Sequence, residues 1–160
     1  MISNKNKLFY WVPALIWMWI IFMFSSQPAS DSNELSVGLT RILVEILGKI
    51  LPFNIETSTI SNIVIQLNHI IRKLAHFSLY MVLGILVYGA IIKNGMLKKE
   101  LLISLIICII YAVSDELHQL FVPGRGCQLK DVFIDSTGAF TGILISKLVY
   151  SKKKLSKFSK

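Results

Sequence analysis

The chain has 160 residues, carries a formal net charge of +8, and is 54% hydrophobic with a mean hydropathy of +0.63. Its apolar residues are gathered into runs long enough to cross a bilayer, which excludes an ordinary soluble domain. The basic excess does not indicate nucleic-acid binding, because the lysines stand in short blocks between hydrophobic runs and form no basic face with interleaved aromatic residues.

Four segments match the length of about 20 apolar residues that a transmembrane helix needs. They are residues 8–24, 74–92, 101–121 and 131–150. Two lysines precede the first segment, but its apolar run is longer than that of a signal peptide and no cleavage motif follows it, so we interpret it as a span. The sequence therefore predicts an all-α integral membrane protein: a four-transmembrane-helix bundle forming a single domain over residues 1–160.

Residues 28–70 form an insert between the first two spans. "SSQPASDSNE" at 25–34 predicts a turn, because Pro28 breaks a helix and Ser, Asp and Asn are capping residues. Residues 35–51 have apolar positions at helical spacing, which predicts an amphipathic helix that lies on the membrane surface or caps the bundle. The same spacing runs from near Thr59 into the second span and predicts one long helix that projects beyond the membrane.

The distribution of lysines predicts the orientation in the membrane. With the N-terminus in the cytoplasm, eleven lysines lie on the inner side, where Glu100 is the only acid, and the other eight acids lie outside. This arrangement predicts a multi-pass protein of the cell membrane with both termini in the cytoplasm. The insert 28–70 is then extracytoplasmic, and the basic C-terminal segment 151–160 anchors the topology.

Polar side chains converge near the predicted outer ends of the spans. At about 1.5 Å of rise per residue, Asp115, His118, Asp135 and His76 all lie within roughly 10 Å of the outer boundary. Helical spacing also places the unusual residues of each span on one stripe. Four helices are therefore predicted to bring their polar and charged residues to the same depth in one leaflet of the membrane.

A charged side chain at the centre of a membrane helix costs about 2.5–3.5 kcal/mol on insertion scales, and less near the interface. The carboxylates at this level are therefore expected to face inward and to pair with nearby basic side chains. The expected pairs join Asp115, Glu116 or Asp135 to Arg72, Lys73 or Arg125. The candidate polar site comprises Gln27, Arg72, Lys73, His76, Tyr80, Asp115, Glu116, His118, Gln119, Arg125, Asp131 and Asp135.

The sequence does not predict a metal or another cofactor. "DELH" at 115–118 is not the HExxH motif, and no two histidines stand four residues apart. Cys108 lies in the third span and Cys127 in a loop, so neither a disulfide nor a zinc-ligand spacing is indicated. Gly138 and Gly142, four residues apart in the fourth span, predict a close helix contact rather than chemistry.

Several of these residues belong to longer motifs in a fixed order. They are "FSSQ" at 24–27, "RKLAHFSLYMVLG" at 72–84, "SDELHQLFVPGRG" at 114–126 and "DVFIDSTGAFTG" at 131–142. In these motifs, which together touch all four spans, the chain resembles the VanZ-like family. The resemblance implies a small integral membrane protein of the Gram-positive cell envelope, in a family named for a member associated with teicoplanin resistance.

Two functional hypotheses follow. In the first, the polar site binds an anionic or sugar-bearing envelope molecule, or a glycopeptide, at the outer leaflet, and Arg72, Lys73 and Arg125 contact its phosphate or carboxylate. The remaining polar residues take hydroxyls and amines, the amphipathic helix forms a wall, and membrane lipids are the other partners.

In the second hypothesis the protein is a membrane enzyme that acts on a lipid-linked or envelope substrate. His76 or His118 would be the general base, oriented by Asp115 or Asp135, and a bound metal ion is a variant of this chemistry. A third alternative is purely structural, in which the polar groups only satisfy one another and lock the bundle. The sequence alone does not decide whether the protein is an enzyme.

Overall fold

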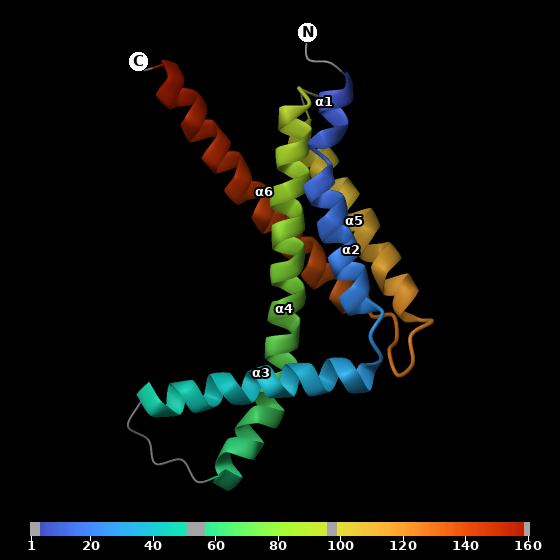
Figure 1. The fold of residues 1–160 in the computed structure, drawn as a ribbon, viewed down its shortest axis with the longest axis vertical. Coiled ribbons are helices and arrows are strands. Elements are labelled where there is room, and N and C mark those ends of the chain that lie inside the picture. Colours follow the sequence, from blue (N-terminus) through green and yellow to red (C-terminus); the bar gives the residue numbers. More distant parts are fainter. Residues whose placement is uncertain (1–3, 51–56, 96–98, 159–160) are drawn as a thin grey trace.

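The computed structural model of the protein describes residues 4–50, 57–95 and 99–158, and no strand occurs among them. The helices are α1 (Asn4–Phe9), α2 (Val12–Ser25), α3 (Ala29–Ile50), α4 (Thr57–Lys93), α5 (Glu100–Gln119) and α6 (Leu129–Phe158). Figure 1 shows α2, α4 and α5 side by side, α6 crossing α4 obliquely, and α3 lying across one end of this bundle. The start of α1 and the last turns of α6 lie at the end opposite α3 (Figure 1).

Four helical segments of the described residues are long and apolar enough to cross a membrane, which confirms the predicted fold class. They are Lys7–Ser25, Ile63–Lys93, Glu100–Gln119 and Leu129–Lys152. The second segment begins at Ile63 rather than at residue 74, because α4 is one continuous helix of 37 residues whose apolar spacing starts in the insert. The predicted long helix near Thr59 is thus observed, with its first residue at Thr57.

The start of α3 differs from the prediction. The predicted turn over residues 25–34 is confined to the three residues between Ser25, where α2 ends, and Ala29, where α3 begins. Pro28 immediately precedes α3, a position compatible with proline because the first helical N–H groups need no helical partner. Asp31 then lies in the first turn of α3, where a negative charge interacts favourably with the helix dipole.

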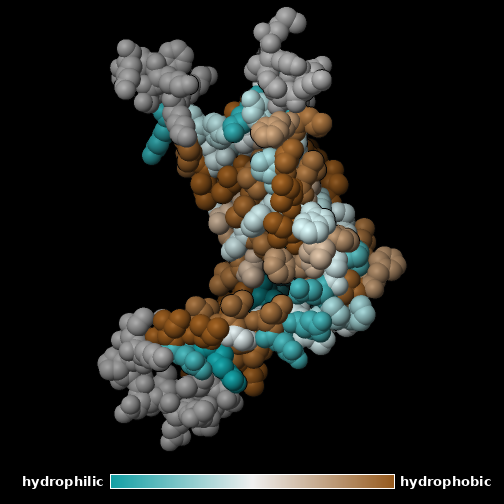
Figure 2. All heavy atoms as spheres, in the orientation of Figure 1, coloured by the Kyte–Doolittle hydropathy of each residue, from teal (hydrophilic) through white to brown (hydrophobic). Residues whose placement is uncertain are grey.

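The α3 helix is amphipathic, as predicted. Thr40 and Val44 are buried on the side of α3 that packs on α4, and Asn68 Nδ2 donates a hydrogen bond of 2.9 Å to Asn33 Oδ1. Further apolar side chains of α3 are exposed, namely Leu35, Leu39, Ile42, Leu43 and Ile46. Figure 2 shows the hydrophobic side of α3 turned toward the spanning helices and its hydrophilic side turned away from them. This orientation is that of a helix lying in a membrane interface.

Glycines let α4 and α6 cross in contact. A Cβ added to Gly138 or Gly142 would collide with a backbone carbonyl of α4, and one added to Gly84 would collide with the carbonyl of Ala139 on α6. The predicted close contact at Gly138 and Gly142 is therefore confirmed, and Gly84 completes it from the other helix. Small residues at such crossings let two membrane helices approach closely along their backbones.

Two side-chain hydrogen bonds tie α2 to the helices beside it. The Trp17 indole donates from Nε1 to the Leu79 carbonyl of α4 at 2.8 Å. The Tyr111 hydroxyl of α5 donates to the Met18 carbonyl at 2.6 Å. Both aromatic residues thereby satisfy their polar atoms within an apolar environment, as buried Trp and Tyr usually do.

Candidate functional site

A cavity of about 530 Å³ lies between α2, α3 and α4, and α5 and the loop that follows it close one end. Its polar lining residues are Ser25, Gln27, Ser32, Ser36, Arg72, His76, Ser78, Tyr80, Asp115 and Arg125. The remaining lining residues are mainly apolar and come from α2, α3 and α4. We call this cavity the α2–α4 pocket.

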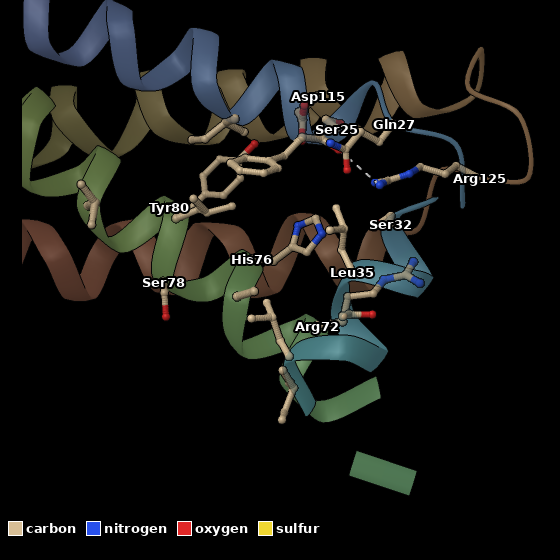
Figure 3. Close-up of a pocket in the computed structure, with 18 of the residues that line it drawn as sticks. Ser25, Gln27, Ser32, Leu35, Arg72, His76, Ser78, Tyr80, Asp115 and Arg125 are labelled. Atoms are coloured by element: carbon tan, nitrogen blue, oxygen red, sulfur yellow. Dashed lines mark hydrogen bonds between the residues drawn. The ribbon is translucent and has the colours of Figure 1, made fainter. Parts of the chain in front are cut away.

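Six of the residues predicted for the site line the α2–α4 pocket: Gln27, Arg72, His76, Tyr80, Asp115 and Arg125. They come from α4, from α5 and from the segments that follow α2 and α5, so three of the four sequence motifs meet here. In Figure 3 the side chains of His76, Tyr80 and Arg125 approach a common space beside Asp115. Helices distant in sequence thus supply one polar end to the pocket.

Buried carboxylates lie around this polar end. The side chains of Asp115, Glu116 and Asp135 belong to residues only 4%, 1% and 0% exposed. Both carboxylate oxygens of Asp115 and the hydroxyl of Tyr80 have no hydrogen-bond partner within the described part of the chain. An unsatisfied buried polar group costs about 1–3 kcal/mol, so a small side-chain movement that lets a ligand or water in the pocket reach these buried atoms would be favourable.

His76 connects the pocket to α6. Its Nδ1 lies 3.6 Å from Asp135 Oδ1, and Asp135 is fully buried behind it. The sequence predicted that Asp115, Glu116 and Asp135 would pair with Arg72, Lys73 or Arg125; among the described residues this histidine is the only basic partner found for any of the three. For Asp135 the reason is geometric, because it meets α4 at His76, which lies four residues, about one turn, beyond Arg72.

The loop after α5 presents Arg125 to the pocket. Gly124 has a φ of +73°, a left-handed conformation that glycine adopts without strain, and it lets the chain turn back so that Arg125 N–H donates to the Val122 carbonyl at 3.1 Å. Arg125 Nη2 donates a long hydrogen bond of 3.3 Å to the Phe24 carbonyl, and its Nε is buried without a partner in the described residues. The arginine is thus held at the pocket with donor capacity to spare.

Two positive charges share the polar end. Burial lowers the pKa of Arg125 from its ordinary value, and the charge of Arg72 lowers it further, against the opposing effect of Asp115 and Glu116. Neither arginine forms an ion pair with a carboxylate in the parts of the chain that the structure covers. Like charges gathered without such partners favour an anion between them.

Lys73 and Asp131 lie outside the lining of the pocket and pair with each other. Lys73 Nζ is 2.6 Å from Asp131 Oδ1, and the two side chains are 30% and 25% exposed. The pair joins α4 to the first turn of α6. This lysine was predicted to contact a ligand; in the structure its Nζ pairs with Asp131, and it is not among the residues that line the pocket.

The other predicted site residues support helix ends near the pocket. Glu116 Oε2 accepts a hydrogen bond of 2.9 Å from the Gln128 backbone N–H, just before α6 begins. Gln119 Nε2 donates to Ser25 Oγ at 3.1 Å. His118 Nε2 lies 3.1 Å from Ser26 Oγ, and its ring lies on that of Phe22 with centroids 4.6 Å apart. The contacts of Gln119 and His118 fix the end of α2 against the end of α5, and that of Glu116 fixes α5 against the start of α6.

The binding hypothesis made the amphipathic helix a wall of the site without naming its residues, and in the structure four residues of α3 line the pocket. Ser32, Leu35, Ser36 and Leu39 line it, at the helical spacing i, i+3, i+4 and i+7. That periodicity was visible in the sequence for the apolar pair. It did not reveal the serines, because Ser32 precedes the predicted start at residue 35 and Ser36, although inside the predicted helix, is not part of the apolar pattern.

No group of three or more His, Cys, Asp or Glu side chains with the geometry to hold a metal ion is found in the described ranges. Both cysteines are free, Cys108 buried in α5 and Cys127 exposed in the loop before α6. The polar chemistry available at the pocket is therefore that of two guanidinium groups, one imidazole, one carboxamide, one unpaired carboxylate and several hydroxyls.

Comparison with known proteins found no curated protein and no solved structure that matches the chain. The family model described as VanZ/LLP1 matches residues 10–150, which include the whole polar site and all but the outermost residues of the four segments that, in the described ranges, could span a membrane. The match agrees with the resemblance carried by the four sequence motifs. The chain therefore belongs to the VanZ/LLP1 family of membrane proteins.

Proposed function

We propose that the protein binds an anionic or sugar-bearing molecule of the cell envelope in the α2–α4 pocket, at the outer leaflet of the membrane. The observation that carries this proposal is the polar end of the pocket, where Arg72 and Arg125 lie without carboxylate partners among the described residues and Asp115 keeps both oxygens unbonded. Guanidinium groups bind phosphate and carboxylate with paired hydrogen bonds, and a buried carboxylate accepts hydroxyls and amines.

Thermal unfolding of the purified protein tests this function. A ligand present at 100 times its Kd stabilises a protein by about 2.7 kcal/mol, so an envelope lipid, a lipid-linked saccharide or a glycopeptide that occupies the pocket raises Tm. Arg72→Gln and Arg125→Gln should abolish the rise. Arg41→Gln, which makes the same charge change at an exposed position of α3, should preserve it. A rise that persists in both pocket variants would place the binding site elsewhere.

A glycopeptide belongs in this screen because the family resemblance points to teicoplanin. A contribution to teicoplanin resistance in a Gram-positive cell requires more than binding. It requires that cells producing the protein tolerate more teicoplanin, and that Arg72→Gln or Arg125→Gln removes the tolerance at an unchanged protein level. Equal tolerance with and without the pocket arginines would separate the pocket from resistance.

The orientation on which the outer-leaflet location depends has its own test in the two native cysteines. Cys127 is exposed in the loop at the pocket end, and Cys108 is buried in α5. A membrane-impermeant thiol reagent added to intact cells should label the protein through Cys127, and Cys127→Ser should remove the label. In that Cys127→Ser protein, Lys99→Cys at the opposite end should stay unlabelled until the cells are opened. The reverse pattern would put the pocket on the cytoplasmic side.

Catalysis is the second candidate function, and the contact between His76 and Asp135 favours it. The Asp135 carboxylate lies 3.6 Å from Nδ1, slightly beyond hydrogen-bond distance, so a small movement would let it orient the imidazole, and the ring reaches the pocket, as a general base for an envelope substrate must. His76→Gln would then abolish turnover while leaving the ligand-induced rise in Tm in place. Binding without any turnover in the unmodified protein favours the binding function alone.

A further inference from the structure

The α2–α4 pocket has two ends of opposite character. Its apolar wall is formed by α2 and α4, with Trp17, Ile21, Leu79 and Val82 among the lining residues. The Trp17 indole N–H is already bonded to the Leu79 carbonyl at 2.8 Å, so the ring offers the pocket an apolar surface. A ligand that fills both ends must itself be amphiphilic.

The pocket also opens toward the region that lipid occupies. Three of its apolar lining residues, Phe24, Leu35 and Leu39, are 49%, 55% and 60% exposed. They lie where the end of the first span meets α3, and the hydrophobic side of α3 is turned toward the spans (Figure 2). In a bilayer such a mouth is covered by acyl chains, so a lipid can enter from the side without crossing water.

We propose that the ligand of the α2–α4 pocket is a membrane lipid whose phosphodiester lies between Arg72 and Arg125 and whose chain lies along the wall formed by α2 and α4. This inference rests on the function proposed above and names the chemical class of its ligand. A volume of about 530 Å³ suits a headgroup and the first part of one chain, because pockets for drug-sized ligands measure roughly 300–1,000 Å³. The rest of the lipid remains in the bilayer.

The polar end also specifies the headgroup. The two arginines supply donors for the phosphate, while Asp115 supplies two buried acceptor oxygens that have no partner in the described structure. A carboxylate would repel a second anionic group but accepts hydrogen bonds from hydroxyls and amines, so the headgroup that fits carries such a donor beyond its phosphodiester. Phosphatidylglycerol has this chemistry. Phosphatidylethanol has the same charge without the hydroxyls.

Tryptophan quenching by lipids with brominated chains tests the inference in the intact protein. One variant, Trp11→Phe with Trp19→Phe, keeps only Trp17 in the pocket wall. A second, Trp11→Phe with Trp17→Phe, keeps only Trp19, which is 62% exposed and lies outside the lining. In vesicles of phosphatidylcholine containing a small fraction of brominated lipid, Trp17 should be quenched by brominated phosphatidylglycerol well beyond brominated phosphatidylcholine. Trp19 should respond equally to both.

The competing ligands separate the parts of the proposal. Unbrominated phosphatidylglycerol should relieve the excess quenching of Trp17, and phosphatidylethanol should do so about tenfold more weakly, because Asp115 then stays unbonded. Diacylglycerol, which lacks phosphate, and soluble glycerol phosphate, which lacks chains, should not relieve it. Relief of the quenching by glycerol phosphate at the same concentration would refute the requirement for an acyl chain. Relief by diacylglycerol would refute the requirement for a phosphate.

The arginine variants complete the test. Arg72→Gln and Arg125→Gln, placed in the protein that keeps only Trp17, should abolish its preference for phosphatidylglycerol, whereas Arg41→Gln should retain it. Equal quenching of Trp17 by both brominated lipids in the unmodified background would overturn this inference. If a glycopeptide or a saccharide still raised Tm through the same arginines, the proposed binding function would stand with a different ligand.

Discussion

The two sides of α4 perform different tasks. On the side that meets α6, Gly84 on α4 and Gly138 and Gly142 on α6 bring the backbones together and leave no room for a single methyl group. On the side that meets α2 and α3, Arg72, His76 and Tyr80 line an open pocket of about 530 Å³. Both sides belong to one uninterrupted helix. The close contact fixes the position of α4, and the open side can therefore hold polar groups that do not satisfy one another.

The largest expected effect comes from filling the close contact. Gly142→Val places side-chain atoms against the Met81 carbonyl and forces α4 and α6 apart, which should lower the free energy of unfolding by about 3 kcal/mol, the upper end for overpacking. Gly38→Ala on α3 is the matched control, because a Cβ there meets nothing within 4 Å and alanine favours the helix. Unfolding in detergent, followed by circular dichroism, measures both. Equal stability of the two variants would refute the close contact.

On the open side, a substitution should change binding rather than stability. Asp115→Asn keeps the shape but replaces an acceptor carboxylate with an amide, so ligand binding should weaken by about 2 kcal/mol, the value of a hydrogen bond to a charged group. The ligand-free protein should unfold at an unchanged or higher Tm, because an unpaired buried charge is removed. Glu45→Gln, at an exposed position on α3, serves as the control. A marked fall in the Tm of the Asp115→Asn protein would instead make this aspartate a structural residue.

The smallest expected effect lies at the ion pair between Lys73 and Asp131, which joins the two helices at the rim. A double-mutant cycle with Lys73→Met and Asp131→Asn should give a coupling energy below about 1 kcal/mol, as for other partly exposed pairs. Ligand binding should be unaffected, since neither residue lines the pocket. If the Lys73→Met protein no longer bound the ligand, Lys73 would have to contribute to the binding site after all.

The sequence predicted the four spans, the long helix now called α4 and the meeting of polar residues at one end, because all three depend on helical period and length. It did not decide between partners, because it offered arginine or lysine for the carboxylates in one hypothesis and a histidine in the other. Helical spacing gives the side of a helix on which Asp135 lies, but the choice of His76 over Arg72 depends on how α4 and α6 cross. The contribution of Ser32 and Ser36 was missed for a similar reason, because only the packing of α3 over the pocket makes them lining residues.

One backbone hydrogen bond links parts of the pocket that are far apart in the chain. The Ala29 N–H, at the first residue of α3, donates to the Pro123 carbonyl at 3.1 Å, two residues before Arg125. This bond joins the start of α3 to the loop that carries Arg125. An outward movement of the start of α3 would therefore either break the bond or move the loop with it. Binding of a headgroup to Arg125 should accordingly change the position or mobility of α3. A spin label on that helix should therefore distinguish the occupied pocket from the empty one.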